Sequence, residues 1–230
     1  MAIPEKIKCT VTNWNYIYDL CRDLSSIVIE SGYEPDIIVA LARGGWFAGR
    51  MVCDFLGISD LISLKVEHYV GTARLGDECK VRYPITEEMV KGKQVLIVDD
   101  IADTGKSLLH ASTYVKEFNP GDCRTGVLQL LFTSETVPDY FAEFLENWTW
   151  VVYPWNFIED MIDLTAKLMA QERKDVWTEK SIKAGLYRWF SIEPIHLDIA
   201  QPGRLPEILK EMQRRGKLTS TEGGWRLNER

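Results

Sequence analysis

The stretch VLIVDDIADTGKS, residues 95–107, decides the fold of this chain. Four apolar residues lead into two adjacent carboxylates, Asp99 and Asp100, and a short polar loop then opens a helix predicted from about Gly105 to Phe118. Continuous apolar runs are typical of strands buried in a parallel sheet, and ligands of open α/β sheets bind beyond the carboxyl ends of such strands. The stretch therefore predicts a buried strand, a ligand-binding loop and a helix in direct succession.

The rest of the chain up to about residue 160 repeats this alternation. Apolar runs predict further strands at 36–42, 61–66, 125–132 and 148–153, and amphipathic stretches predict helices at 13–31 and 46–56. We expect an α/β fold in which a parallel twisted sheet is flanked by helices. Two connections are expected as well: a long functional loop over the polar residues 67–84, and a short helix after Pro138.

The loop that follows the two carboxylates has the composition of an anion site. A helix N-terminus favours a phosphate, Thr104 and Ser107 add hydroxyl donors, and Gly105 lets the backbone approach a ligand closely. Carboxylates beside such a cradle suit a sugar phosphate, because they can accept hydrogen bonds from ribose hydroxyls or share a Mg²⁺ ion. A nucleoside-triphosphate P-loop is excluded, because Asp100 stands where that motif needs a glycine. Trp46 likewise replaces the second glycine of a dinucleotide-binding fingerprint.

Residues 98–107, VDDIADTGKS, resemble the phosphoribosyl-pyrophosphate (PRPP) signature of the type I phosphoribosyltransferases. The DTGK portion is similar to the 6-oxopurine branch of that family, which uses hypoxanthine, guanine or xanthine. Residues 42–45, ARGG, match the place of the family's pyrophosphate loop, where the resemblance implies a cis peptide at Arg43–Gly44. Residues 150–156, WVVYPWN, resemble the hood segment of bacterial xanthine-guanine phosphoribosyltransferases.

The resemblance implies a pentosyltransferase of purine salvage that moves the ribose 5-phosphate of PRPP to a purine base and releases pyrophosphate. Mg²⁺ is the implied cofactor, and PRPP and the base, with a 6-oxopurine favoured, are the implied small-molecule partners. The implied site residues are Asp99 and Asp100 for the ribose and Mg²⁺, Asp103 as the catalytic acid/base, Asp103, Thr104, Gly105, Lys106 and Ser107 for the 5′-phosphate, Arg43 and Gly44 for pyrophosphate, and Trp150, Val151 and Ser134 for the base. The 67–84 loop would close over pyrophosphate, with Arg74, Lys80 or Arg82 as contacts.

One position departs from the family pattern. The 6-oxopurine enzymes carry a lysine just after the strand that corresponds to residues 127–132, and Ser134 lies at or near that place here. A hydroxyl can donate to a purine carbonyl but supplies no positive charge. The identity of the base therefore stays open, and an enzyme acting on a different base-like ring is an alternative.

Charge divides the chain into two parts. Residues 161–230 hold 13 Lys and Arg against 10 Asp and Glu, which leaves 14 against 24 for residues 1–160. We expect a phosphoribosyltransferase domain with its hood at 1–162 and a small winged-helix-like domain at 163–230. The prediction of the winged-helix-like domain rests on expected helices at 177–189 and 205–215, a short strand at 195–197 and a hairpin at 217–227.

This extension opens an alternative function, a PRPP-sensing transcription regulator with a DNA-binding winged helix. The cations available to phosphates are Arg214, Arg215, Lys217 and Arg226. An excess of three positive charges over 70 residues is modest, so nucleic acid is open but not favoured, and a packing or dimerisation module is preferred.

The sequence also bounds the compartment and the partners. It opens with no apolar run of signal-peptide length, and no stretch approaches the roughly 20 apolar residues of a membrane span. The five cysteines are scattered without a Cys-x-x-Cys pair, which argues against a disulfide framework or a zinc site. We expect a cytoplasmic protein that forms a homodimer and has no membrane partner.

Overall fold

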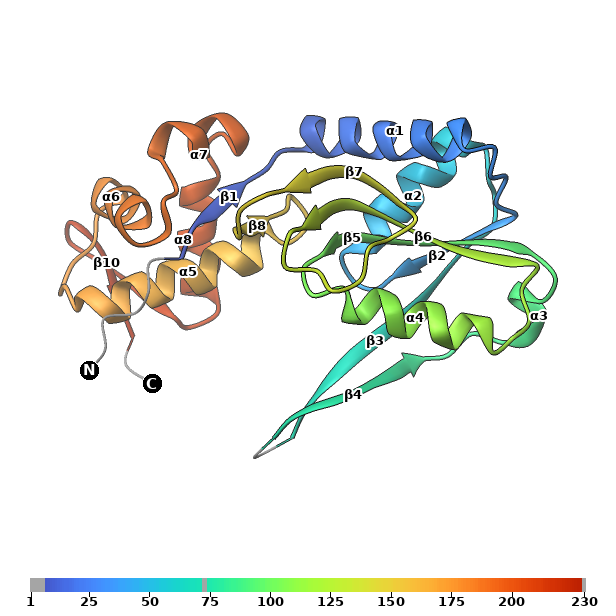
Figure 1. Ribbon diagram of the computed structural model, residues 1–230. Coiled ribbons are helices and arrows are strands. Elements are labelled where there is room, and N and C mark those ends of the chain that lie inside the picture. The colour runs from blue at the N-terminus through green and yellow to red at the C-terminus, as the bar shows by residue number, and fades with distance from the viewer. Residues whose placement is uncertain (1–6, 72–73, 229–230) are drawn as a thin grey trace. The chain divides into compact units, whose positions relative to one another are not determined.

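The computed structural model describes residues 7–71 and 74–228. For residues 67–71 and 74–80 it describes the backbone and not the side chains. The chain forms two compact units (Figure 1). One comprises Asn15–Trp148, and the other combines the residues up to Trp14 with those from Thr149 onward. This division differs from the boundary expected at 162/163, which falls inside helix α5 (Phe157–Glu172). A helix that buries residues on both sides of position 162 cannot mark the end of a unit.

The unit Asn15–Trp148 contains a six-stranded sheet, which confirms the expected parallel sheet flanked by helices. The strand order is β4-β3-β2-β5-β6-β7, and every neighbouring pair is parallel except the antiparallel pair β3–β4. The strands are β2 (Ile37–Leu41), β3 (Leu61–Gly71), β4 (Arg74–Tyr83), β5 (Gln94–Ala102), β6 (Asp122–Leu131) and β7 (Tyr140–Leu145).

Helices cover both faces of this sheet, as Figure 1 shows, and the central strands β2 and β5 are buried between them. Alternate side chains of a strand point to opposite faces, so a strand covered on both sides must be apolar throughout. On one face Val39 and Ile97 pack with the helix that follows β5. On the other face a β-carbon added at Gly49 would lie 2.7 Å from the Ala40 β-carbon. The helices of this unit are α1 (Trp14–Glu30), α2 (Gly45–Leu56), α3 (Glu87–Val90) and α4 (Lys106–Lys116).

Two expected connections are wrong. Residues 67–84 were expected as a loop, but β3 and β4 form a long antiparallel hairpin whose backbone pairing runs from Lys65–Tyr83 to Gly71–Arg74. The expected helix after Pro138 is the edge strand β7, because its residues pair in parallel with β6 from Gly126–Tyr140 onward. Both elements lie at the two edges of the sheet, where a strand needs neither a continuous apolar run nor burial on both faces.

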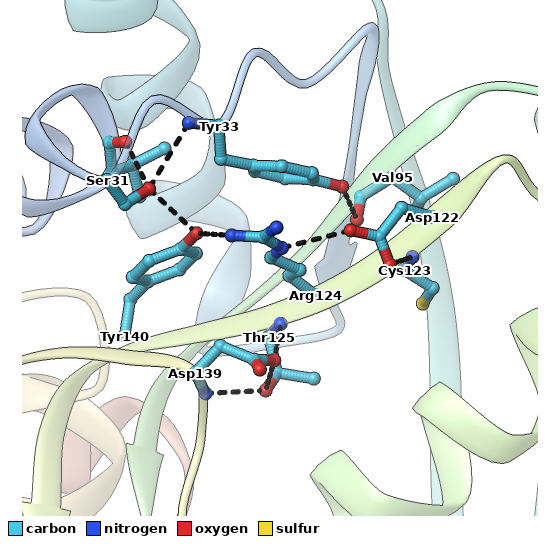
Figure 2. A network of polar contacts seen from close by, with 10 residues as sticks. Ser31, Tyr33, Val95, Asp122, Cys123, Arg124, Thr125, Asp139 and Tyr140 are labelled. Atoms are coloured by element: carbon cyan, nitrogen blue, oxygen red, sulfur yellow. Dashed lines mark hydrogen bonds and ion pairs between the residues drawn. The ribbon is translucent and has the colours of Figure 1, made fainter.

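A cation holds the amino ends of β5, β6 and β7 together (Figure 2). The Arg124 guanidinium lies 4.3 Å from the centre of the Tyr33 ring and donates to Asp122 at 3.0 Å and to the Tyr140 hydroxyl at 2.6 Å. The Tyr33 hydroxyl in turn donates to the Val95 carbonyl at 2.8 Å. This network lies at the end of the sheet opposite Asp99 and Asp100.

The second unit joins the start of the chain to its last 82 residues. Strand β1 (Cys9–Val11) pairs in parallel with β8 (Trp150–Val152), and Phe157, Leu168, Trp177, Leu186 and Leu209 belong to one apolar core. The remaining elements are α6 (Glu179–Phe190), α7 (Pro194–Ala200), α8 (Arg204–Arg214), β9 (Leu218–Thr221) and β10 (Gly224–Leu227).

The short strand expected at 195–197 is wrong, because these residues lie in α7. Pro194 occupies the first turn of that helix, where its fixed backbone angle is favourable. The extra strand position next to the hairpin is taken instead by Trp177, which exchanges two 2.8 Å backbone hydrogen bonds with Trp225. Among the described residues, no helix has the length and hydropathy needed to cross a bilayer.

Candidate functional site

The two carboxylates lie at the carboxyl end of β5, against the turn that begins α2. Asp99 Oδ1 accepts from the Asp100 N–H at 2.9 Å, and Asp100 Oδ1 accepts from the Ile101 N–H at 2.9 Å. A β-carbon added at Gly45 would lie 2.6 Å from the Val98 carbonyl oxygen and 3.0 Å from Asp99 Oδ1, and one added at Gly44 would overlap the Asp100 carboxylate. The two glycines therefore let the 42–45 turn approach both carboxylates at backbone distance.

The turn contains a cis peptide, but at Ala42–Arg43 and not at Arg43–Gly44 as expected. The Ala42 N–H still donates to the Leu64 carbonyl at 2.9 Å, so the strand ladder extends to Ala42. Gly44 already has helical dihedrals, φ −62° and ψ −45°, as the residue before α2. The change of direction is thus complete before Gly44, and the Arg43 side chain is exposed at the bend.

Burial and the negative charge of Asp100 raise the pKa of the Asp99 carboxyl well above its ordinary value, and the Gly45 N–H opposes this effect. A cation near both carboxylates would relieve their repulsion. No group of three or more His, Cys, Asp and Glu in the described part of the chain is placed to hold a metal alone. Two adjacent carboxylates nevertheless fit Mg²⁺, which keeps several waters and takes its other ligands from substrate oxygens.

The loop between β5 and α4 is built around Gly105. This residue has φ +74°, and α4 begins at the next residue, Lys106. Asp103 and Thr104 are exposed, and the Lys106 N–H lies 3.4 Å from Thr104 Oγ1. The first turn of a helix offers N–H groups that have no partner within the helix, and it favours negative charge. The loop thus combines exposed donors and one carboxylate beside Asp99 and Asp100.

The turn after β6 supports this loop, and it contains a residue that sequence reasoning missed. The Thr133 hydroxyl lies 3.0 Å from Asp103 Oδ1 and 3.1 Å from the Asp103 carbonyl oxygen. The Glu135 N–H donates to the Thr104 carbonyl at 3.2 Å. A signal was present in the sequence, because β5 and β6 are neighbouring parallel strands and the loops after such strands meet at one edge of the sheet.

Ser134 has a different environment from the one expected for a base contact. Its hydroxyl donates to the Thr136 carbonyl at 2.7 Å, within its own turn. A β-carbon added at Gly105 would lie 2.6 Å from Ser134 Oγ, so the serine packs directly against the loop. The structure therefore brings Ser134 to the 103–107 loop, but its hydroxyl hydrogen is directed to the backbone.

The remaining expected residues lie elsewhere. Trp150 and Val151 belong to β8 in the other unit, where the Trp150 side chain is 48% exposed and Val151 pairs with Thr10. Their contact with a base stays a prediction. Arg82 is exposed on β4, whereas the side chains of Arg74 and Lys80 fall outside the described residues.

Similarities to known proteins bear on this site. The family model for the phosphoribosyl transferase domain matches residues 10–157, a range that contains the 42–45 turn, the 103–107 loop and β8. The purine phosphoribosyltransferase from Pyrococcus horikoshii Ot3 is 30% identical, with 64% of this chain and 93% of that chain covered and a TM-score of 0.57.

Two further solved structures share the fold at lower identity. A hypothetical protein from Neisseria gonorrhoeae with bound ppGpp is 21% identical, over 67% of this chain and 92% of that one, with a TM-score of 0.58. The xanthine-guanine-hypoxanthine phosphoribosyltransferase of Helicobacter pylori is 15% identical, over 66% of this chain and 97% of that one, with a TM-score of 0.53. The matched region leaves most of the second unit outside the family model.

Proposed function

Because the chain belongs to the phosphoribosyl transferase domain family, we propose that it transfers the ribose 5-phosphate of PRPP to a purine base and releases pyrophosphate. The observation that carries the proposal is the contact of the Gly44–Gly45 turn with the carboxylates of Asp99 and Asp100. It sets a backbone turn suited to pyrophosphate beside two acceptors suited to ribose hydroxyls. The 103–107 loop, suited to a 5′-phosphate, follows directly on the same strand.

The chemistry asked of these residues is positioning and charge stabilisation. Positive charge develops on the ribose ring as pyrophosphate leaves, and the carboxylates of Asp99 and Asp100 stabilise it and accept from the ribose hydroxyls. The Arg43–Gly44 turn holds the departing pyrophosphate, and backbone and hydroxyl donors from Thr104 to Ser107 hold the 5′-phosphate. A bound Mg²⁺ would neutralise charge on the pyrophosphate, with Asp99 and Asp100 as its protein ligands.

Asp103 is the proposed acid/base, which manages the proton near purine N7. Its side chain is exposed in the 103–107 loop. The Thr133 hydroxyl, 3.0 Å from Asp103 Oδ1, restricts the orientation of the carboxylate. A general acid or base must lie within hydrogen-bond reach of the proton that it transfers, so this restriction matters for the rate.

A 6-oxopurine is the favoured base, with Trp150 stacking on it and Val151 contacting its edge through the backbone. The DTGK motif and the name of the 30% identical Pyrococcus protein support a purine. Ser134 must turn its hydroxyl away from the Thr136 carbonyl before it can donate to a purine oxygen. This cost, together with the missing lysine, keeps a different base-like ring as an alternative substrate.

The proposal is tested by incubating the protein with Mg²⁺, PRPP and a panel of hypoxanthine, guanine, xanthine, adenine and uracil, and by measuring pyrophosphate release. We expect release with a 6-oxopurine and a large loss in Asp103→Asn, while the control Asp54→Asn, on the exposed face of α2, retains activity. If no base supports release and Asp103→Asn behaves as the parent does, the enzyme proposal fails.

A PRPP-sensing regulator is the second candidate, and the order of α7, α8 and a hairpin favours it as a winged-helix arrangement. The charge on α8 weighs against it. Glu211 accepts from Arg214 and Arg215 at 2.6–2.7 Å, and these hydrogen bonds lower the pKa of the Glu211 carboxyl to about 2. Salt-dependent DNA binding that responds to PRPP, without turnover of any base, would decide for the regulator.

A further inference from the structure

A groove in the second unit runs between the outer face of α5 and the β9–β10 hairpin. It consists of two adjoining hollows of about 890 and 770 Å³, which share Ala170, Leu227 and Asn228 as lining residues. Its lining includes the small or apolar residues Ala166, Met169, Ala170 and Leu227, and none of the described lining residues is aromatic. The groove lies outside the residues that the family model matches.

The lining of the groove is strongly basic. Two acidic residues, Asp163 and Asp175, face six cations, which are Lys167, Arg173, Lys174, Arg215, Lys217 and Arg226. Three of these cations have carboxylate partners, in the pairs Lys167–Asp163 and Lys174–Glu172 at 2.6 Å and Arg215–Glu211 at 2.7 Å.

Three cations stay without a carboxylate partner among the described residues: Arg173, Lys217 and Arg226. They come from three separate places: the residue directly after α5, the residue before β9, and strand β10. The Arg226 guanidinium is held against the segment that follows α5, because its Nε donates to the Asp175 carbonyl at 3.3 Å. Arg173 and Arg226 line the same hollow from opposite walls, and Lys217 lines the adjoining one.

We propose that this groove binds a compact oligophosphate anion, of the size of the phosphate chain of a nucleoside triphosphate. Guanidinium groups form paired hydrogen bonds with phosphate oxygens, and a ligand held between two walls is contacted from both sides. Nucleic acid fits less well, because a concave groove without aromatic side chains offers no platform for stacked bases. On α8, the helix that would enter a duplex, Arg214 is tied to Glu211 by two hydrogen bonds.

The test is calorimetric titration of the full chain with sodium tripolyphosphate in buffer without Mg²⁺. The groove variant is Arg173→Gln with Arg226→Gln, and the matched control is Lys210→Gln with Arg214→Gln, which removes the same charge from α8. The exposed positions of all four residues keep the core intact, and a melting curve checks this. We expect the groove variant to lose at least about a hundredfold in affinity at one class of site, or tenfold for each guanidinium, while the control changes less than threefold.

The proposed PRPP site can also bind this anion, so binding that persists in the groove variant belongs to that site and supports the assignment of the lost class to the groove. Equal affinity in the parent and the groove variant would overturn the proposal, and so would an equal loss in the control. Displacement of tripolyphosphate by a 20-base-pair duplex at lower concentration than by ATP would assign the groove to nucleic acid and overturn it as well. Because no base or PRPP is used, the result does not depend on catalysis.

Discussion

Thr133 and Asp103, which follow neighbouring strands, are joined by a hydrogen bond of 3.0 Å between the threonine hydroxyl and Asp103 Oδ1. The same hydroxyl lies 3.1 Å from the Asp103 carbonyl, so it contacts both the side chain and the backbone of one residue. Thr133 is therefore a positioning residue for the carboxylate that we propose as the acid/base. It acts through Asp103 and not on the substrate.

Thr133→Val removes this hydroxyl but keeps the shape of the side chain. A hydrogen bond to a charged group contributes about 1.5–3 kcal/mol, so we expect kcat to fall by at least about tenfold with little change in KM for PRPP. Thr133→Ser retains the hydroxyl and should restore most of the rate. Steady-state kinetics of the two variants check this, and an unchanged kcat in Thr133→Val would contradict the positioning role.

Gly44→Ala should weaken PRPP binding without unfolding the chain. The added β-carbon overlaps the Asp100 carboxylate, so either the turn or the carboxylate must move. Overpacking of this kind costs about 1–3 kcal/mol, and we expect at least about tenfold weaker PRPP binding. Gly126→Ala is the control, because its β-carbon would meet Leu24 at 3.5 Å, an ordinary contact. Comparable PRPP affinities in the two variants would show that the close approach is not needed.

The Asp99 carboxyl makes stability depend on pH. Its pKa is raised in the folded chain, so its contribution is most favourable below the ordinary value of 3.8 and is lost as the pH rises through the raised pKa. Asp99→Asn removes the cost of burying this negative charge. Without ligand, the variant should therefore melt above the parent at pH 7.5, by about 2–4 °C for each kcal/mol relieved. The difference should shrink as the pH falls toward 4. Thermal melts across this range check the sign, and a variant that melts below the parent at pH 7.5 would contradict it.

A fragment ending at residue 162 should not form the core of the second unit. It cuts α5 in its second turn and removes Leu168, Trp177 and Leu209 from the core that Phe157 and Met161 share. The exposed apolar surface should make the fragment aggregate, whereas the full chain elutes as a defined species. Size-exclusion chromatography and circular dichroism of both proteins test this. A soluble fragment with cooperative unfolding would restore the expected boundary at 162/163.

The parts that could be predicted from the sequence are those buried on both sides. The apolar run before Asp99 predicts a central strand between two layers of helices, which is what the structure shows. The glycine in the loop after it predicts a close approach of the backbone, as found at Gly105. The edge strands β4 and β7 and the short helix α7 were missed because none of them needs a long apolar pattern. Thr133 was missed for a different reason, since its role depends on a contact 30 residues away that no local pattern carries.

The pairing of β1 with β8 has a consequence for biosynthesis. Thr12 and Val152, which share two hydrogen bonds of 3.1 Å, are 140 residues apart, and nearly all of the residues between them form the nested unit Asn15–Trp148. At about 5–20 residues per second, the ribosome delivers β8 roughly 7 to 28 s after β1. Strand β1 therefore waits without its partner while the residues of an entire α/β unit are synthesised. The order in which the two units mature is fixed by the path of the chain.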